Sequence, residues 1–121
     1  MYSILIADRD PASRNALQLI LSQKMGISHF QEAGDVDTLI RLLADNPPDI
    51  LLLDWRIYGA PAPEICRLLR KAYPNLKIAL LSVDANDVIS ANDCGAVFIH
   101  KGAPPDEVVA VLNSLLKDQS K

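Results

Sequence analysis

The sequence predicts an α/β domain in which helices cover both faces of a doubly wound, five-stranded parallel sheet. Short apolar runs alternate five times with segments of helical periodicity along the 121 residues. Four of the runs are apolar on successive residues, which is typical of parallel strands buried on both sides. Glycine and proline residues separate the segments, as expected at the ends of helices.

The first strand is expected at residues 3–8, with the sequence SILIAD. Asp10 and Pro11 then provide an N-cap and a first-turn proline, so the first helix runs from there to about Lys24. Residues 27–33, ISHFQEA, are less apolar and form the second strand. The chain therefore opens with a strand, a helix and a strand, as a parallel sheet requires.

Three later helices are predicted from apolar residues at positions i, i+3, i+4 and i+7, which place one apolar stripe on each. The stripes are Val36, Leu39, Ile40 and Leu43, then Ile65, Leu68, Leu69 and Ala72, and finally Val108, Val111, Leu112 and Leu115. The remaining strands are expected at residues 49–54, 77–82 and 96–101. Residues 84–94 form the poorest helix, because polar residues dilute its apolar face.

Length and charge exclude several classes of protein. The chain fits one domain, residues 1–121, with residues 118–121 expected to be a disordered tail. The net charge is −3 and no dense run of lysine and arginine occurs, so nucleic acid is not an expected partner. No apolar run is long enough to span a membrane. Cys66 and Cys94 lack metal-site spacing and are expected to be buried and reduced, which indicates a cytoplasmic protein.

Polar residues follow four of the predicted strands: Asp8, Asp54, Ser82 and Lys101. Ligands of open parallel sheets bind at the carboxyl ends of the strands, where these four side chains should converge. Carboxylate oxygens hold Mg²⁺, while an ammonium and a hydroxyl meet phosphate oxygens. A single polar residue at a strand end usually just contacts solvent, but four of these types favour a functional site.

The stretches ILIADRDP, PDILLLDWR, IALLS and FIHK, with the five strand-helix units, resemble the receiver domain of bacterial two-component response regulators of the chemotaxis-regulator type. The resemblance covers nearly the whole chain. It implies a flavodoxin-like sheet of strand order 2-1-3-4-5 and a phosphorelay function, with phosphorylation of an aspartate after the third strand. It implies no enzyme, beyond self-phosphorylation and self-dephosphorylation of that aspartate.

By this resemblance Asp54 is the phospho-acceptor, which attacks the phosphorus of a phosphohistidine or a small phosphodonor. Asp8 and Asp54, with the backbone carbonyl of Arg56, match the Mg²⁺ ligands. Ser82 matches the hydroxyl residue that turns towards the phosphoryl group, and Lys101 matches the lysine that pairs with it. The same resemblance makes Ser82 a switch residue.

Phe98 matches the aromatic residue whose rotamer reports phosphorylation to a protein-interaction face. A core aromatic on a buried strand explains Phe98 equally well. His29 and His100 lack the partners that a phosphohistidine or metal role needs, and both are expected at the surface.

Arg9 departs from the family, which usually has an acid there. The exchange moves the local charge by two units and should weaken or abolish Mg²⁺ binding. Arg9 could bridge to Asp54 in the place of the metal, or it could extend into solvent. Asp10 could supply the missing carboxylate, although its N-cap role is favoured. Val83 is also atypical, because its branched side chain stands where the family usually has a small residue.

Three functions remain open from the sequence. The leading one is a receiver that accepts a phosphoryl group on Asp54 from a histidine kinase or phosphotransfer protein. Phosphorylation would then switch a protein-interaction face. The partner at this face would be a downstream effector protein, an output domain outside this chain, or a second copy of the domain in a homodimer. The second is a pseudo-receiver, a phosphorylation-independent interaction module with Arg9 in the metal pocket. The third and remote one is a haloacid-dehalogenase-type phosphohydrolase, in which Asp8 attacks phosphate and Asp10 is the general acid and base.

Overall fold

The computed structural model describes residues 2–117 and has one parallel sheet of strand order β2-β1-β3-β4-β5. The strands are β1 (Ser3–Ala7), β2 (His29–Ala33), β3 (Ile50–Asp54), β4 (Lys77–Ser82) and β5 (Val97–His100). The helices are α1 (Pro11–Met25), α2 (Val36–Asp45), α3 (Ala62–Ala72), the 3₁₀ helix η1 (Ala85–Asp87), α4 (Val88–Asp93) and α5 (Pro105–Lys117). The predicted fold and strand order are confirmed, whereas the expected tail at residues 118–121 lies outside the described part.

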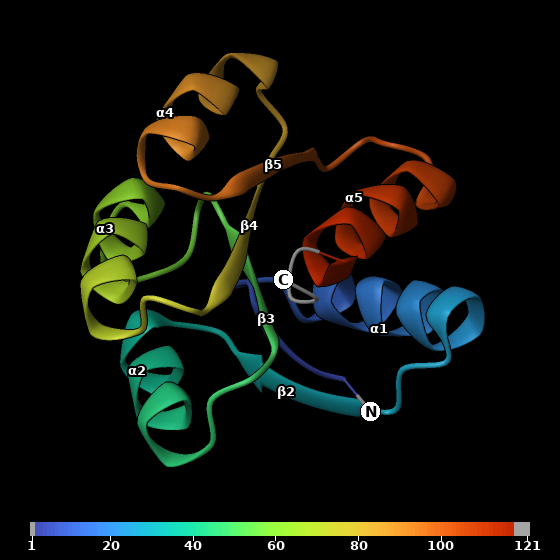
Figure 1. Ribbon diagram of the computed structural model, residues 1–121, viewed down its shortest axis with the longest axis horizontal. Coiled ribbons are helices and arrows are strands. Elements are labelled where there is room, and N and C mark those ends of the chain that lie inside the picture. Colours follow the sequence, from blue (N-terminus) through green and yellow to red (C-terminus); the bar gives the residue numbers. More distant parts are fainter. Residues whose placement is uncertain (1, 118–121) are drawn as a thin grey trace.

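Two layers of helices enclose the sheet, with α1 and α5 on one face and α2, α3 and α4 on the other (Figure 1). Alternate residues of each central strand serve the two faces. On β3, Leu51 and Leu53 pack under α2 and α3, while Ile50 and Leu52 pack under α1 and α5. All four are at most 1% exposed, which explains why the strand is apolar on successive residues.

Caps mark the ends of the first two helices. The Asp10 side chain accepts a hydrogen bond from the Ala12 backbone N–H at 3.0 Å, which confirms its predicted N-cap role. At the other end of α1, Gly26 adopts a left-handed conformation with φ of 67°, a position that favours glycine. The Asp35 side chain caps α2 by accepting from the Thr38 N–H at 2.7 Å.

Two of the predicted apolar stripes are partly wrong. Ile40 is 48% exposed and Leu68 is 62% exposed, and Ala72 is exposed as well. The buried stripe of α3 begins one turn earlier and consists of Ala62, Ile65, Cys66 and Leu69. That stripe has the same i, i+3, i+4, i+7 spacing, so the helical period was predicted correctly and its phase was not.

The weakest predicted helix is also the shortest in the structure. Residues 84–94 contain only the 3₁₀ turn η1 and the six residues of α4, in which Ala91 is the buried residue. Beneath it lie Cys66 and Cys94, both buried and free as predicted. Burial raises the pKa of the Cys66 thiol to about 12, so this thiol stays protonated and unreactive at neutral pH. Among residues 2–117, no helix combines the length and apolar character needed to cross a membrane.

Candidate functional site

The carboxyl edge of the sheet gathers the four predicted residues. Asp8 directly follows β1, Asp54 ends β3, Ser82 ends β4 and Lys101 directly follows β5. Backbone hydrogen bonds continue past the strands here, from Trp55 N to the Leu81 carbonyl and from Lys101 N to the Ser82 carbonyl, both at 2.8 Å. The sheet therefore fixes the backbone positions from which these side chains project.

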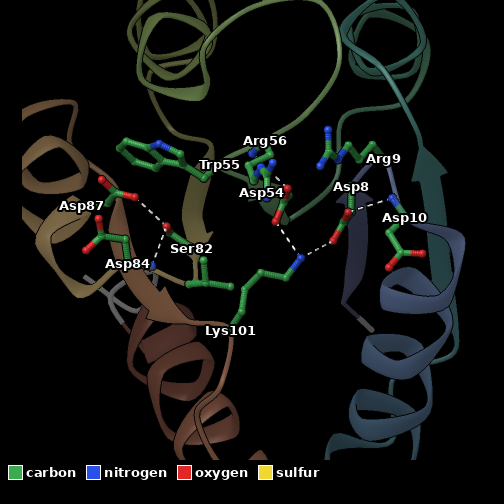
Figure 2. A pocket seen from close by; sticks show the side chains of 11 residues that line it. Asp8, Arg9, Asp10, Asp54, Trp55, Arg56, Ser82, Asp84, Asp87 and Lys101 are labelled. Atoms are coloured by element: carbon green, nitrogen blue, oxygen red, sulfur yellow. Dashed lines mark hydrogen bonds and ion pairs between the residues drawn. The ribbon is translucent and has the colours of Figure 1, made fainter.

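A cavity of about 490 Å³ opens at this edge and contains all four residues. It is lined by Asp8, Arg9, Asp10, Asp54, Trp55, Arg56, Ser82, Val83, Asp84, Asp87 and Lys101. Figure 2 shows Lys101 reaching towards Asp8 and Asp54, with Ser82 and Asp87 to one side. The cavity is thus a mixed-charge pocket, with five carboxylates and three cations around it.

Lys101 joins the two buried carboxylates. Its Nζ donates to Asp54 Oδ1 at 2.8 Å and to Asp8 Oδ2 at 2.9 Å. Asp8 is 2% exposed and Asp54 is 5% exposed, so both charges need partners. The other oxygens accept backbone hydrogen bonds, Asp54 Oδ2 from Arg56 N and Asp8 Oδ1 from Asp10 N, each at 2.9 Å. Each carboxylate oxygen therefore has a donor.

Exchange of Lys101 for methionine is expected to lower the free energy of unfolding by about 2 kcal/mol at neutral pH. Two neighbouring buried carboxylates then lose their shared cation and repel each other. The loss is smaller than for a fully buried pair, because the Lys101 side chain is 24% exposed. Urea unfolding of both proteins measures the difference.

The difference in the free energy of unfolding between the wild type and Lys101→Met should also depend on pH. Partial burial lowers the pKa of Lys101, but the hydrogen bonds to Asp54 and Asp8 outweigh it and raise that pKa above its ordinary value of 10.5. A raised lysine pKa stabilises the fold below the ordinary value, and this stabilisation is lost as the pH rises through the raised value. The free energy of unfolding should therefore differ between the two proteins by a constant amount up to about pH 10, and by a decreasing amount above it. An equal loss in Lys71→Met, at the exposed end of α3, would contradict the assignment.

The Ser82 hydroxyl makes its hydrogen bonds with the segment at the η1 turn rather than with Asp54. Its Oγ donates to Asp87 Oδ2 at 2.6 Å and accepts from the Asp84 N–H at 3.1 Å. Sequence reasoning missed Asp87, since the residue lies in the segment with the weakest helical pattern. A carboxylate five residues after the strand-end hydroxyl was the available signal.

Arg9 lies at the rim of the pocket, over the ring of Tyr58, with the guanidinium carbon 5.3 Å from the ring centroid. Such cation–π contacts hold arginine side chains at partly exposed positions. In the described part of the chain, the ion pair of Asp54 is with Lys101 rather than with Arg9. Arg9 thus follows neither predicted course fully, because it neither bridges Asp54 nor extends freely into solvent. Tyr58 was not singled out from the sequence.

The remaining predicted residues lie around this centre. Val83 is 67% exposed at the mouth of the cavity, and Arg56 is exposed at its rim. Phe98 lies outside the cavity lining, half-buried against the core beneath α2, α3 and α4. His29 and His100 are both exposed, as predicted.

The donor set fits a weakly held Mg²⁺. Asp8, Asp54 and the Arg56 backbone would provide the oxygen ligands, and Mg²⁺ in proteins often has one or two carboxylates with several waters. Asp10 caps α1 instead of turning to Asp8, and residues 2–117 contain no cluster of three or more acidic, histidine or cysteine side chains suited to a metal ion. Lys101 also competes for both carboxylates.

Comparison with known sequences supports the resemblance. The family model described as "Response regulator receiver domain" matches residues 4–113. The response regulator UvrY of Escherichia coli K12 is 27% identical over 98% of this chain and 56% of its own length. The glycerol metabolism activator of Pseudomonas putida is 29% identical over 96% of this chain and 54% of its own. The chain therefore spans about half the length of these curated relatives.

Comparison with solved structures supports the fold. A putative response regulator from Chloroflexus aurantiacus J-10-fl superposes with a TM-score of 0.86 and 24% identity, over 96% of this chain and 98% of that one. The family match covers most of the chain, and the strand order and the acidic pocket agree with it. The chain belongs to the receiver domains of bacterial response regulators.

Proposed function

We propose that this receiver domain accepts a phosphoryl group on Asp54. Receiver domains of response regulators serve phosphorelay signalling and are signalling modules rather than metabolic enzymes. In the proposed step an Asp54 oxygen attacks phosphorus, the bond from phosphorus to the donor breaks, and an acyl phosphate forms. The donor is a histidine kinase or phosphotransfer protein, whose imidazole leaves.

One observation carries this proposal: Lys101 holds Asp54 and Asp8 with a single ammonium at 2.8 and 2.9 Å inside an open cavity. The Arg56 N–H and the Lys101 ammonium fix the Asp54 carboxylate in one orientation, which favours reaction of one positioned oxygen. The same ammonium can neutralise charge that arrives with the phosphoryl group. Magnesium, when bound by Asp8, Asp54 and the Arg56 carbonyl, would supply further charge neutralisation.

The partners follow from this function. We assign the output to a downstream effector or to an output domain, since the curated relatives extend well beyond the length matched here. Self-dephosphorylation of Asp54, a homodimer and a cytoplasmic location belong to the same proposal. Phe98 is the proposed aromatic switch, because it lies between the sheet and the α2–α3–α4 layer.

A mass measurement tests the proposal. The protein is incubated with acetyl phosphate and Mg²⁺, and we expect its intact mass to increase by one phosphoryl group. Omission of Mg²⁺ is the control and should reduce the yield. An unchanged mass across the whole range of Mg²⁺ and donor concentrations would overturn the proposal.

The pseudo-receiver is the second candidate, and Arg9 favours it. A cation at the rim of a pocket that already contains Lys101 weakens attraction for Mg²⁺. In that case the wild-type protein would stay unmodified and Arg9→Asp would gain the phosphoryl group.

A further inference from the structure

The Ser82 hydroxyl already donates its proton within the structure. It donates its one proton to Asp87 Oδ2 at 2.6 Å, and its oxygen accepts from the Asp84 N–H at 3.1 Å. Figure 2 shows this hydroxyl directed towards Asp87, with Asp54 and Lys101 on the other side of the cavity. The residue expected to meet a phosphoryl group on Asp54 is therefore bound elsewhere.

Two anionic groups, the Asp87 carboxylate and a phosphoryl group on Asp54, compete for the Ser82 hydroxyl proton. A serine hydroxyl has one proton, so it donates either to Asp87 or to a phosphoryl oxygen on Asp54. Hydrogen bonds from a hydroxyl to a carboxylate are short and about twice as strong as neutral ones. The contact with Asp87 thus competes directly with the phosphoryl contact.

Among the described residues, few other side-chain hydrogen bonds hold the segment that contains Asp87. Asp87 ends the 3₁₀ turn η1, and its backbone N–H donates to the Asp84 carbonyl at 3.1 Å. The adjoining α4 has only six residues and one buried residue, while Ile89 on it is 67% exposed. A side-chain tether between β4 and this turn therefore has a large share in holding η1 and the start of α4 in place.

We propose that Asp87 is a positioning residue that holds the Ser82 hydroxyl away from Asp54, and so restrains both phosphorylation and the movement of α4. The proposal rests on the proposed function of Asp54. When the hydroxyl turns to the phosphoryl group, Asp87 loses its partner and η1 is released. The Ser82–Asp87 hydrogen bond is then the element that links the pocket to α4.

Phosphorylation rates test the first half of the proposal. With acetyl phosphate, Asp87→Asn should react about fivefold faster than the wild type and Asp87→Ala about tenfold faster, since asparagine retains a weaker acceptor. Asp84→Asn is the matched control, because it removes one charge from the same cavity and its side chain contacts Asn86 rather than the Ser82 hydroxyl. This control should change the rate less than twofold.

A double variant separates the hydrogen bond from simple charge repulsion. In Ser82→Ala the hydroxyl is gone, so adding Asp87→Asn should leave the rate unchanged. An acceleration that persists without the hydroxyl would overturn the proposal, because it would arise from charge alone. Equal acceleration in Asp87→Asn and Asp84→Asn would overturn it in the same way.

Hydrogen exchange of the unmodified protein tests the second half without any phosphoryl transfer. Ser82→Ala and Asp87→Asn should each increase exchange of the α4 amides about tenfold, and the double variant should add nothing further. If the wild type takes no phosphoryl group but these exchange rates rise, Asp54 phosphorylation fails and the tether stands. If the wild type is phosphorylated and α4 exchange is unchanged, the tether fails and the phospho-acceptor stands.

Discussion

A protein with asparagine in place of Asp54 is expected to gain no phosphoryl group from acetyl phosphate, at any Mg²⁺ concentration. The neutral amide is a far weaker nucleophile than the carboxylate it replaces. The amide oxygen can still accept from the Arg56 N–H, and Lys101 keeps its ion pair with Asp8 although it loses its acceptor on residue 54, so the fold should persist. Intact mass measures the adduct, and circular dichroism verifies the fold.

Two further variants show whether Asp54 itself is modified. Asp45→Asn removes an exposed carboxylate at the end of α2 and should be phosphorylated like the wild type. Asp8→Asn should slow the reaction without abolishing it, since Asp8 is a proposed ligand of Mg²⁺ and forms no bond to phosphorus. An adduct that survives in Asp54→Asn and disappears in Asp8→Asn would instead place the nucleophile at Asp8, as in the haloacid-dehalogenase-type phosphohydrolases.

Exchange of Arg9 for aspartate is expected to increase the affinity for Mg²⁺ about 100-fold. The change removes a cation from the cavity rim and adds an anion, so the charge that faces a divalent ion in the cavity becomes more negative by two units. Trp55 lines the same cavity and is half-buried, so its fluorescence reports the titration. The Mg²⁺ concentration needed for half-maximal phosphorylation should fall with the dissociation constant.

Two controls separate a local effect from a general one. Arg9→Ala removes the cation without adding an acid and should give an intermediate affinity. Lys71→Asp makes the same change of charge at the far end of α3, an exposed position, and should leave Mg²⁺ binding nearly unchanged because intervening solvent screens it. Equal gains in Lys71→Asp and Arg9→Asp would show that only net charge matters.

The strand ends were predictable because they obey a simple rule. A parallel sheet brings the residues after its apolar runs to one edge, so Asp8, Asp54, Ser82 and Lys101 could be placed together from spacing alone. The hydrogen-bond partner of each side chain was harder to predict from the sequence. Lys101 was expected to pair with a phosphoryl group on Asp54, and the structure shows its ammonium bound to the Asp54 and Asp8 carboxylates themselves.

What the sequence did not reveal depends on turn geometry and helix phase. Asp87 meets Ser82 only because the chain makes a 3₁₀ turn after β4, and no periodicity encodes that turn. Leu68 and Ile40 follow the helical period yet face solvent, because apolar residues also occur on exposed faces.

The contact between Arg9 and Tyr58 has a consequence for comparing receiver sequences. The Tyr58 carbonyl accepts from the Val36 N–H at 2.9 Å, so the loop that presents the ring is fastened to the start of α2. The backbone that carries the ring is therefore fixed in place, and Arg9 lies over the ring that it presents. Receivers with arginine directly after the first strand-end aspartate should carry an aromatic residue four positions beyond the acceptor aspartate, as here, and the two positions should covary across the family. An alignment of such receivers in which the two vary independently would count against this pairing.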